Sequence, residues 1–594
     1  MSPSPLPISA RDVRIALLTA FVALLVYNAN LRLIASGDSY PARFIPFALW
    51  KHGTVYLDEI REAATQRHRI PYWLMNAPNG RSASVYPVVT PILVTPLYGP
   101  AVLYLEKAGW SYENLSRVGA VMEKFAGSCV ASSAVFLMFL VLRRRLDRRD
   151  ALLLTGAFAF GTTTWAVSSQ ALWQHGPAEL LLLAALWFIT GESSRANTLA
   201  AGFATGLLVA NRAPDVLLAV ALSLYALYWA RGRAVFFALA AALPLALVVT
   251  YNLITFSHLG GGYGAAGVTS PSFFAKPILP GVAGLLVSPG LGLFVFCPFL
   301  LFLPFLFHRS LRDRKYRLLT VLLAGAVISL ILLYAPTDWR GGYAYGPRYL
   351  TDAVPALIWM LAPVLASLGT VARTTFLACC LFAAGVQYIG AFHFTGKAFL
   401  TYYAPPAGPD EMRNVWVPAN AGFLLEGSNP RQPRDVWHTL RSLAHPVPSA
   451  RPLPPVPPPP LVSRQAAGPP RPSHPSDFYT VPPCILVDTR KENPLMRDGP
   501  PRALNLAGAR CSIPATATAI VVKVAVPERN EGGTILLCPD GVDQGCLAVS
   551  FGREPQTVEV ILPLAADGSG TVMVKTNARS VHLMLEVGGY FATD

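Results

Sequence analysis

Charged residues are scarce in this 594-residue chain, where Asp, Glu, Lys and Arg make up only 14% of the sequence. Soluble domains usually carry about 25%. Hydrophobic residues account for 53% of the chain and the mean hydropathy is +0.43. This composition excludes an ordinary soluble protein and indicates an integral membrane protein. The net charge of +15 does not indicate a nucleic-acid partner, because the basic residues stand in short clusters between apolar segments, as topology determinants do.

Cysteine is also scarce, with 8 residues in the chain, and no Cys/His spacing is typical of a zinc site. The C-terminal region holds an even number of cysteines, which suits a compartment that permits disulfides. These disulfide candidates are Cys484, Cys511, Cys538 and Cys546. Three pairings are possible, and the sequence does not choose among them. The remaining cysteines lie in apolar segments and are expected to be small core residues.

Long apolar stretches are abundant. A helix rises about 1.5 Å per residue, so about 20 apolar residues cross about 30 Å of hydrocarbon. We expect eleven spanning segments, near residues 13–35, 116–142, 151–169, 176–191, 197–211, 214–230, 234–256, 281–307, 317–334, 350–369 and 373–392. The first is too long for the apolar core of a signal peptide and lacks a clear cleavage site, so we interpret it as an uncleaved anchor.

Three basic clusters, at residues 143–149, 231–233 and 308–317, are expected to face the cytoplasm. All three do so if the N-terminus is cytoplasmic and residues 87–106 do not cross. That stretch contains four prolines, which break or kink a helix, so we expect it to be juxtamembrane or re-entrant. The first outer loop is then long, about residues 36–115, and the C-terminus lies outside.

The apolar pattern ends near residue 395, which bounds a polytopic α-helical membrane domain at 1–395. We expect 396–446 to be an exported juxtamembrane segment. Residues 447–475 are rich in proline and predict an extended spacer that cannot pack a core. Residues 476–594 contain short β-branched runs separated by Gly, Asp, Asn and Pro, which predict an exported all-β domain of sandwich or barrel type.

Acidic residues of the first outer loop are candidates for chemistry. Asp38 directly follows the first apolar run, within the sequence SGDS. It is either a turn or cap residue, or a general base that deprotonates an acceptor hydroxyl as that group attacks a sugar. Because a charge so near the hydrocarbon is costly unless paired or hydrated, we favour a functional role. The pair Asp58 and Glu59 is less specific, and we favour an ordinary solvated loop pair.

The sequence WQHGPAE at residues 173–179 is unusual at the boundary of a span. His175 and Glu179 are four residues apart and share one face of a helix that begins near Pro177 or slightly earlier. In a purely structural interpretation, Trp173 is an interfacial anchor and His175 only caps the helix. In a functional interpretation, His175 binds phosphate or sugar. Both interpretations remain open.

The sequence DWRGGYAYGPRYLTD at residues 338–352 combines arginines, glycines and tyrosines. Glycines let a backbone approach a ligand closely, and arginine forks suit phosphate oxygens. An aromatic belt with snorkelling arginines is the alternative, but the density of this loop favours function. The substrate-binding candidates of the chain are Arg81, Tyr86, His175, Arg212, Arg340, Tyr345 and Arg348.

The layout resembles that of the GT-C superfamily, polytopic glycosyltransferases that use polyprenyl-phosphate sugars. The resemblance rests on the first span followed at once by GD, the long outer loop and the sequence YPVVTPILVTPLYG at 86–99. It covers about residues 10–395, and bacterial enzymes similar to dolichyl-phosphate-mannose mannosyltransferases are nearest in layout. It implies that Asp38 is the base, and that residues 87–96 correspond to the family's juxtamembrane proline stretch.

Two positions depart from the pattern of that superfamily. Many members carry a basic residue before the prolines, where this chain has SVYP, which leaves Arg81 as the substitute phosphate contact. Several families carry a second acid after the third span, where Glu179 is the only acid here. The resemblance therefore makes Glu179 a second catalytic candidate.

The C-terminal region has a resemblance of its own. The sequences PPCILVDTR at 482–490 and VGGYF at 587–591 are similar to the two ends of a repeat found in bacterial surface proteins. The similar region covers about residues 478–592. It implies binding to the cell wall or to a glycan.

Together these features predict transfer of a sugar from a polyprenyl-phosphate donor to a glycan, lipid or protein acceptor. The reaction would occur at the outer face of the cytoplasmic membrane, with inversion if there is one displacement. A divalent metal ion could assist, although no ligand set stands out. One alternative is a transporter or flippase, which the absence of a clear inverted repeat and the few midplane charges disfavour. The other is a non-catalytic scaffold that displays the β domain.

Overall fold

The computed structural model describes residues 7–66, 71–267, 271–403, 412–444, 477–491, 494–496, 502–506, 511, 513–514, 516–526, 533–538, 547–551, 556–564 and 570–592. The chain divides into two compact units, Met1–Pro455 and Val456–Asp594, which are described separately below. The proline-rich spacer expected at 447–475 lies outside the described residues.

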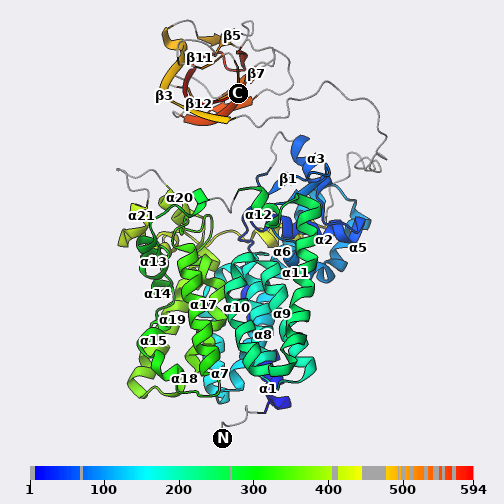
Figure 1. Cartoon of the computed structure of the whole chain (residues 1–594), viewed down its shortest axis with the longest axis vertical. Helices are drawn as coiled ribbons and strands as arrows, with labels where there is room; N and C mark the ends of the chain where they lie inside the picture. Colours follow the sequence, from blue (N-terminus) through cyan, green and yellow to red (C-terminus); the bar gives the residue numbers. More distant parts are fainter. Residues whose placement is uncertain are drawn as a thin grey trace. The chain divides into compact units, whose positions relative to one another are not determined.

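The first unit is a helical bundle (Figure 1). Ten of the eleven apolar stretches are occupied by one main helix each: α1 Ala10–Asn28, α6 Tyr112–Arg143, α7 Arg148–Gly161, α8 His175–Ile189, α9 Arg195–Asn211, α10 Val216–Ala230, α11 Ala234–Phe256, α17 Arg317–Tyr334, α18 Val354–Ala366 and α19 Thr370–His393. Apolar sequences become helical because a helix satisfies its own backbone hydrogen bonds where no water is present.

The stretch near 281–307 differs from the single helix that its hydropathy suggests. It is divided into α13 Ile278–Val287, α14 Leu293–Phe296, the 3-10 turn η6 Pro298–Leu301 and α15 Phe302–Phe305. Pro289 and Pro298 have no backbone N–H to donate, and Gly290 and Gly292 are weak helix formers. The breaks therefore follow from local sequence that a hydropathy average conceals.

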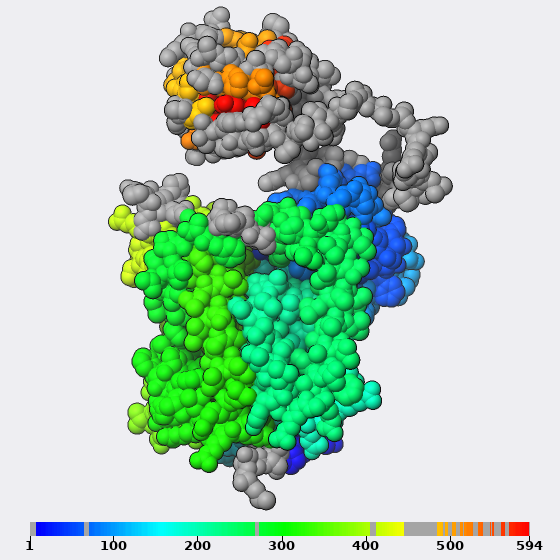
Figure 2. Space-filling model, viewed as in Figure 1, coloured from blue at the N-terminus to red at the C-terminus, as the bar shows by residue number. Residues whose placement is uncertain are grey.

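Within the described residues, five helical segments are long and apolar enough to cross a membrane, which is the pattern of a multi-pass membrane protein. They are Tyr112–Arg143, Ala213–Ala265, Arg317–Tyr334, Arg348–Ala366 and Thr370–His393. The surface that α10, α11 and α17 help to form is visible in Figure 2. Leu239 of α11 is 63% exposed and Leu247 is 64% exposed, as expected for a helix that faces lipid. Eleven crossings remain a prediction.

The first outer loop folds into short helices and a hairpin with a core of their own. Its elements are α2 Tyr40–His52, α3 Asp58–Gln66, β1 Leu74–Asn76, β2 Ser82–Ser84, α4 Val89–Val94, η1 Thr95–Tyr98 and α5 Gly99–Ala108. Phe47 packs edge-on against Tyr98, with ring centroids 4.9 Å apart. None of these helices reaches spanning length. They lie at the end of the unit away from the N-terminus (Figure 1).

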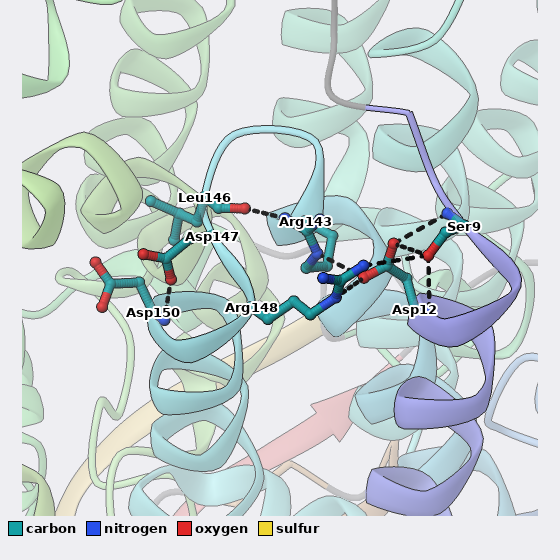
Figure 3. Close-up of polar contacts among 7 residues, drawn as sticks. All are labelled: Ser9, Asp12, Arg143, Leu146, Asp147, Arg148 and Asp150. Atoms are coloured by element: carbon teal, nitrogen blue, oxygen red, sulfur yellow. Dashed lines mark hydrogen bonds and ion pairs between the residues drawn. The ribbon is translucent and has the colours of Figure 1, made fainter.

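The opposite end of the unit is held by ion pairs (Figure 3). Asp12 of α1 is fully buried, and its Oδ1 accepts hydrogen bonds of 2.9 Å from Nε of Arg143 and from Nε of Arg148. Its Oδ2 accepts from the backbone N–H of Ser9 at 2.9 Å and from the Ser9 hydroxyl at 2.6 Å. The basic turn after α6 is thereby tied to the start of α1.

A second ion pair extends this end of the bundle to two further segments. Arg145 donates to Oδ2 of Asp313 at 2.8 Å and to the carbonyl of Trp359 at 2.9 Å. The basic clusters at 143–149 and 308–317 therefore lie on the same end of the helical unit, which is the arrangement that a common cytoplasmic location requires.

The second unit is built from β-strands, which confirms the predicted all-β character. One antiparallel sheet has the order β3-β12-β6-β9 and the other has the order β5-β10-β7-β8. The strands are β3 Asp477–Asp488, β5 Arg502–Asn505, β6 Ala517–Val526, β7 Gly533–Cys538, β8 Leu547–Phe551, β9 Gln556–Pro563, β10 Thr571–Thr576 and β12 Met584–Ala592, with a small pair β4 Leu495–Met496 and β11 Ser580–Val581. Alternate residues of both sheets, such as Val522 and Leu537, enter one hydrophobic core.

A disulfide joins Cys484 to Cys511, with the Cα atoms 5.8 Å apart. Cys538 is also disulfide-bonded, and Cys546 lies outside the described residues. The cysteines of the helical unit are free thiols: Cys129, Cys297, Cys379 and Cys380.

Candidate functional site

Asp38 stands on a turn between the end of α1 and the start of α2. Gly37 makes room for a close neighbour: a Cβ atom at this position would lie 2.2 Å from the hydroxyl oxygen of Tyr72. Only glycine, which has no Cβ, permits that approach. The turn therefore brings the Tyr72 hydroxyl to the carboxylate of the next residue.

The two oxygens of Asp38 have different partners. Oδ1 accepts hydrogen bonds from the hydroxyl of Tyr86 at 2.6 Å and from the hydroxyl of Tyr72 at 3.0 Å. Oδ2 accepts from Nη1 of Arg348 at 2.6 Å. The Arg348 guanidinium lies 4.9 Å from the ring centroid of Trp173, a distance at which an aromatic face attracts a cation.

These contacts set the ionisation of the group. Burial raises the pKa of Asp38, but the positive charge of Arg348 and the hydrogen bonds from Tyr86, Arg348 and Tyr72 outweigh it, so the pKa lies below its usual value. Burial and the negative charge of Asp38 raise the pKa of Tyr72 to about 12, and they raise that of Tyr86 as well. At neutral pH Asp38 is therefore a carboxylate, and both phenols keep the protons that they donate.

Asp38 opens onto a pocket of about 650 Å³, a size typical of small-molecule sites. Rings and two carboxylates dominate its wall. The lining residues are Ala35, Ser36, Gly37, Asp38, Tyr40, Tyr72, Asp338, Gly342, Tyr343, Arg348, Tyr349, Phe399 and Tyr403. Aromatic faces and a few charged groups in a concave site suit a ligand that combines a sugar ring with an anion.

The loop after α17 supplies much of this wall. Asp338 accepts a bidentate pair of hydrogen bonds from Arg340, 2.8 Å from Nε and 2.7 Å from Nη2. Arg340 also donates to the carbonyl of Tyr402 at 3.0 Å and lies 3.9 Å from the ring centroid of Tyr403. Arg340 therefore does not line the pocket; it holds the lining residues Asp338 and Tyr403 in place. Tyr345 is buried and donates to the carbonyl of Val386 at 2.7 Å, away from the pocket.

His175 and Arg212 meet on another carboxylate. Nδ1 of His175 lies 2.8 Å from Oδ1 of Asp352, and Arg212 donates to Oδ2 of the same residue. All three side chains are buried, and none lines the pocket. Because Asp352 and Arg348 belong to the same short helix, η7 Arg348–Ala353, this cluster anchors the element that presents Arg348.

Glu179 is also buried away from the pocket. Its Oε1 accepts a hydrogen bond of 2.7 Å from the hydroxyl of Thr164, on the π-helical turn η2 Thr164–Ser168. Glu179 and His175 share α8, but they have different partners and do not act on one group. The second acid expected from the family resemblance thus lies apart from Asp38 and its pocket.

The remaining charged candidates are paired within the first outer loop. Arg81 donates through Nε to Oδ2 of Asp58 at 2.5 Å and does not line the pocket. Glu59 accepts from Nζ of Lys51 at 2.8 Å and lies 2.8 Å from Nε2 of His52. These pairs leave Tyr86, rather than Arg81, as the contribution of this part of the loop to Asp38.

Several residues of the pocket were not among the sequence candidates. Tyr72 stands beside Trp73 in the outer loop, in the sequence PYWLM at 71–75, and this aromatic pair was not singled out. Phe399 and Tyr403 belong to α20 Lys397–Tyr403, in the segment interpreted only as juxtamembrane. The aromatic cluster FLTYY at 399–403, directly after the last apolar stretch, is a signal that could have identified them.

Among the described residues, no group of three His, Cys, Asp or Glu side chains converges to hold a metal ion. The candidate site as described consists of a carboxylate, a guanidinium, phenols and aromatic walls.

No family model and no curated protein match the sequence. Among solved structures, the chain is similar to ArnT from Cupriavidus metallidurans in the apo state, with 15% identity and a TM-score of 0.37 over 74% of this chain and 78% of that one. It is also similar to the same protein bound to undecaprenyl phosphate, with 15% identity and a TM-score of 0.37 over 73% and 78% of the two chains. A third similarity, to the arabinosyltransferase EmbB from Mycobacterium smegmatis, has 13% identity and a TM-score of 0.27 over 98% of this chain and 64% of that one. These TM-scores are too low for the similarity to bear on the reaction of this chain.

Proposed function

We propose that this protein is a GT-C-like membrane glycosyltransferase that transfers a sugar from a polyprenyl-phosphate donor to the hydroxyl group of a glycan, lipid or protein acceptor. The observation that carries this proposal is the pairing of Asp38 with Arg348 in a pocket walled by aromatic rings. The carboxylate can accept the proton of an acceptor hydroxyl. The guanidinium can bind a phosphate, and the rings can pack against a sugar.

The proposed reaction is a single displacement. Asp38 takes the proton of the acceptor hydroxyl while the acceptor oxygen forms a bond to the anomeric carbon of the donor sugar. The bond between that carbon and the phosphate oxygen breaks, and polyprenyl phosphate leaves with the electron pair. Arg348 stabilises the negative charge that accumulates on the leaving phosphate. Attack and departure on opposite faces of the sugar invert its configuration.

The charge distribution of the helical unit supports an outward-facing site. The basic clusters tied by Arg143 and Arg145 lie at the end that contains the N-terminus, and the outer-loop elements α2, α3 and α5 lie at the other end (Figure 1). Basic loops favour the cytoplasmic side. We therefore place the N-terminus in the cytoplasm of a bacterial cell and Asp38 at the outer face of the cytoplasmic membrane.

We assign no step of this reaction to Glu179. Its carboxyl group is fully buried, bonds to Thr164, and does not line the pocket. A group that accepts a proton from the acceptor has to reach it directly or through one water, and Asp38 meets this requirement better.

Lipid analysis of a deletion strain tests the proposed function. Membranes without the protein should accumulate a polyprenyl-phosphate sugar, detected by mass spectrometry of lipid extracts. Complementation with the wild type should remove the accumulated lipid, and Asp38→Asn should fail to do so at equal protein level. Asp58→Asn is the matched control and should complement, because Asp58 is paired with Arg81 outside the pocket. An unchanged lipid profile in the deletion strain would contradict the proposal.

A further inference from the structure

Asp38 and Arg348 form an ion pair with each other, and this contact opposes both of their proposed roles. A carboxylate held by a guanidinium is a weaker base, because the positive charge stabilises the deprotonated form. A guanidinium already paired with a carboxylate is a weaker phosphate ligand, because the carboxylate offsets its positive charge and occupies one of its N–H groups. The site therefore has to change at this contact before it can act.

The arginine–aspartate pairs Arg340–Asp338 and Arg348–Asp38 differ in how many guanidinium nitrogens donate hydrogen bonds. Arg340 donates to Asp338 through two nitrogens, at 2.8 and 2.7 Å, and through a third to the carbonyl of Tyr402. Arg348 donates to Asp38 through Nη1 alone, and its buried Nε has no hydrogen-bond partner among the described residues. A phosphate accepts two parallel N–H groups from one guanidinium, so it can satisfy Arg348 better than Asp38 does.

The two oxygens of Asp38 also differ. Oδ1 is held by two neutral phenols, Tyr72 and Tyr86, which a phosphate does not attract as it attracts a cation. Oδ2 is held by Arg348. If Arg348 moves, the phenols still fix the position of the carboxylate, and Oδ2 becomes the oxygen that is free to take a proton.

We infer that the donor phosphate replaces the carboxylate of Asp38 as the partner of Arg348. This exchange frees Oδ2 of Asp38 as the proton-accepting atom. This inference rests on the proposed function and adds an order of events: the base is exposed only when the donor has bound. The guanidinium has room to shift, since Arg348 lines the pocket. It keeps an aromatic neighbour as it moves, since Tyr349, whose ring centroid is 5.5 Å away, lines the same pocket. If an acceptor enters before the donor, Oδ2 of Asp38 is still paired with Arg348 and does not take its proton.

The exchange makes a prediction that a simple phosphate contact does not. If Asp38 and phosphate compete for Arg348, then removal of the Asp38 charge has to tighten phosphate binding, because the coupling between two ligands of one group is reciprocal. A residue that only supported the phosphate site would weaken binding when changed.

The test measures binding of undecaprenyl phosphate to the full-length protein in lipid nanodiscs. Asp38→Asn should bind roughly tenfold more tightly than the wild type, within the range usual for coupled sites. Asp338→Asn is the matched control, since it removes the same charge from the same pocket but frees Arg340 instead. In the double variant Asp38→Asn, Arg348→Gln the gain should disappear. Asp38→Ala carries the same expectation should Asp38→Asn fail to give folded protein.

The outcomes distinguish failure of the phosphate exchange from failure of the proposed function. The inference is overturned if Asp38→Asn binds no more tightly than the wild type, gains no more than Asp338→Asn, or keeps its gain when Arg348 is replaced. In those cases the wild type still binds the lipid phosphate and the proposed function stands. If the wild type and all variants fail to bind undecaprenyl phosphate, the proposed function fails, and the exchange fails with it.

Discussion

Two aspartates at different ends of the helical unit each pair with arginine, and they differ in what the pairing leaves available. Asp12 is fully buried, and both of its oxygens are occupied, by Arg143 and Arg148 on one side and Ser9 on the other (Figure 3). The side chain of Asp38 remains 29% exposed and lines a pocket. An ion pair by itself therefore does not identify a site of chemistry.

The surroundings of the two pairs explain their different tasks. The turn that holds Asp12 joins α6 to α7 and caps a helix end: Asp147 accepts the N–H of Asp150 at 2.9 Å at the start of α7. The contacts of Asp12 and Asp147 therefore hold α1, the turn after α6 and the start of α7 together. Around Asp38 the chain instead places glycine turns and aromatic rings, which create space and recognition surface. The comparison predicts that one cluster controls stability and the other controls activity.

The largest expected effect is the loss of turnover in Asp38→Asn. General-base catalysis typically contributes about 10²–10⁴-fold, so the rate constant for transfer should fall by that order. The thermal unfolding temperature should change little, because Arg348, which loses its carboxylate, lines a pocket where water can solvate it. The amide also keeps the shape of the side chain and can still accept hydrogen bonds from Tyr72 and Tyr86. The measurement is transfer of labelled sugar in proteoliposomes. Near-normal transfer would show that the base lies elsewhere.

Asp12→Asn should show the opposite pattern. The change leaves the buried Arg143 without its carboxylate, and removal of one partner from a buried pair costs about 3–5 kcal/mol. Arg148, whose side chain is 40% exposed, loses the same partner at smaller cost because water can solvate it. We expect a lower unfolding temperature in detergent, with near-normal turnover in the protein that remains folded. A large fall in turnover without a fall in stability would mean that the two clusters are not separate in function.

The helical part of the fold follows closely from the sequence, because burial in hydrocarbon depends on local hydropathy. The breaks near Pro289 and Pro298 were equally local but were averaged out over a long apolar stretch. The pairing of strands in the second unit was not accessible from sequence. In that unit β3 pairs with β12, so the first described strand lies beside the last, and no local pattern specifies such a partner.

The candidate site was predicted as separate residues rather than as a geometry. Asp38 and Arg348 were each identified, but their contact joins positions 310 residues apart, and only tertiary packing specifies it. Arg340 and Tyr345 were chosen by the same logic as Arg348, yet they turn away from the pocket. Glycines with positive φ lie between these positions and redirect successive side chains: Gly341, Gly342 and Gly346, with φ of 76°, 69° and 71°.

The pH dependence of transfer should also separate the clusters. In the free protein burial raises the pKa of Asp38, but Arg348, Tyr86 and Tyr72 outweigh it and hold the pKa below its usual value. The carboxylate of Asp338 lines the same pocket, where Arg340 pairs with it. Because kcat/KM reports the free enzyme, its acid limb should lie below about pH 4, the usual range of an aspartate.

Arg348→Gln should move that acid limb to higher pH. The substitution removes the positive charge that lowers the pKa of Asp38, while burial, which raises it, remains. The protonated, inactive form then persists to a higher pH than in the wild type. Arg143→Gln is the control at the other cluster and should leave the position of the limb unchanged. The comparison needs kcat/KM between about pH 3 and 8, and an identical limb in Arg348→Gln and wild type would contradict it.

The smallest expected effect is that of Gly37→Ala, which tests one hydrogen bond of Asp38 without touching any charge. The added Cβ would lie 2.2 Å from the hydroxyl oxygen of Tyr72, whose side chain belongs to a residue that is 69% exposed and can rotate away at little cost. Asp38 then loses its 3.0 Å bond from Tyr72 and keeps the 2.6 Å bond from Tyr86. A hydrogen bond to a charged group is worth about 1.5–3 kcal/mol, and because Tyr86 still holds the carboxylate we expect the lower end of that range, a fall in turnover of roughly tenfold, while the unfolding temperature stays the same.

Two further variants determine whether that loss arises through Tyr72. Tyr72→Phe should lower turnover by the same factor as Gly37→Ala, and the double variant should be no worse than either single one, because both changes remove the same contact. Gly99→Ala is the matched control: its added Cβ would meet nothing nearer than 3.9 Å, so turnover should not change. If Gly37→Ala instead lowers the unfolding temperature, or if the two losses multiply in the double variant, then Gly37 acts on the turn itself rather than through Tyr72.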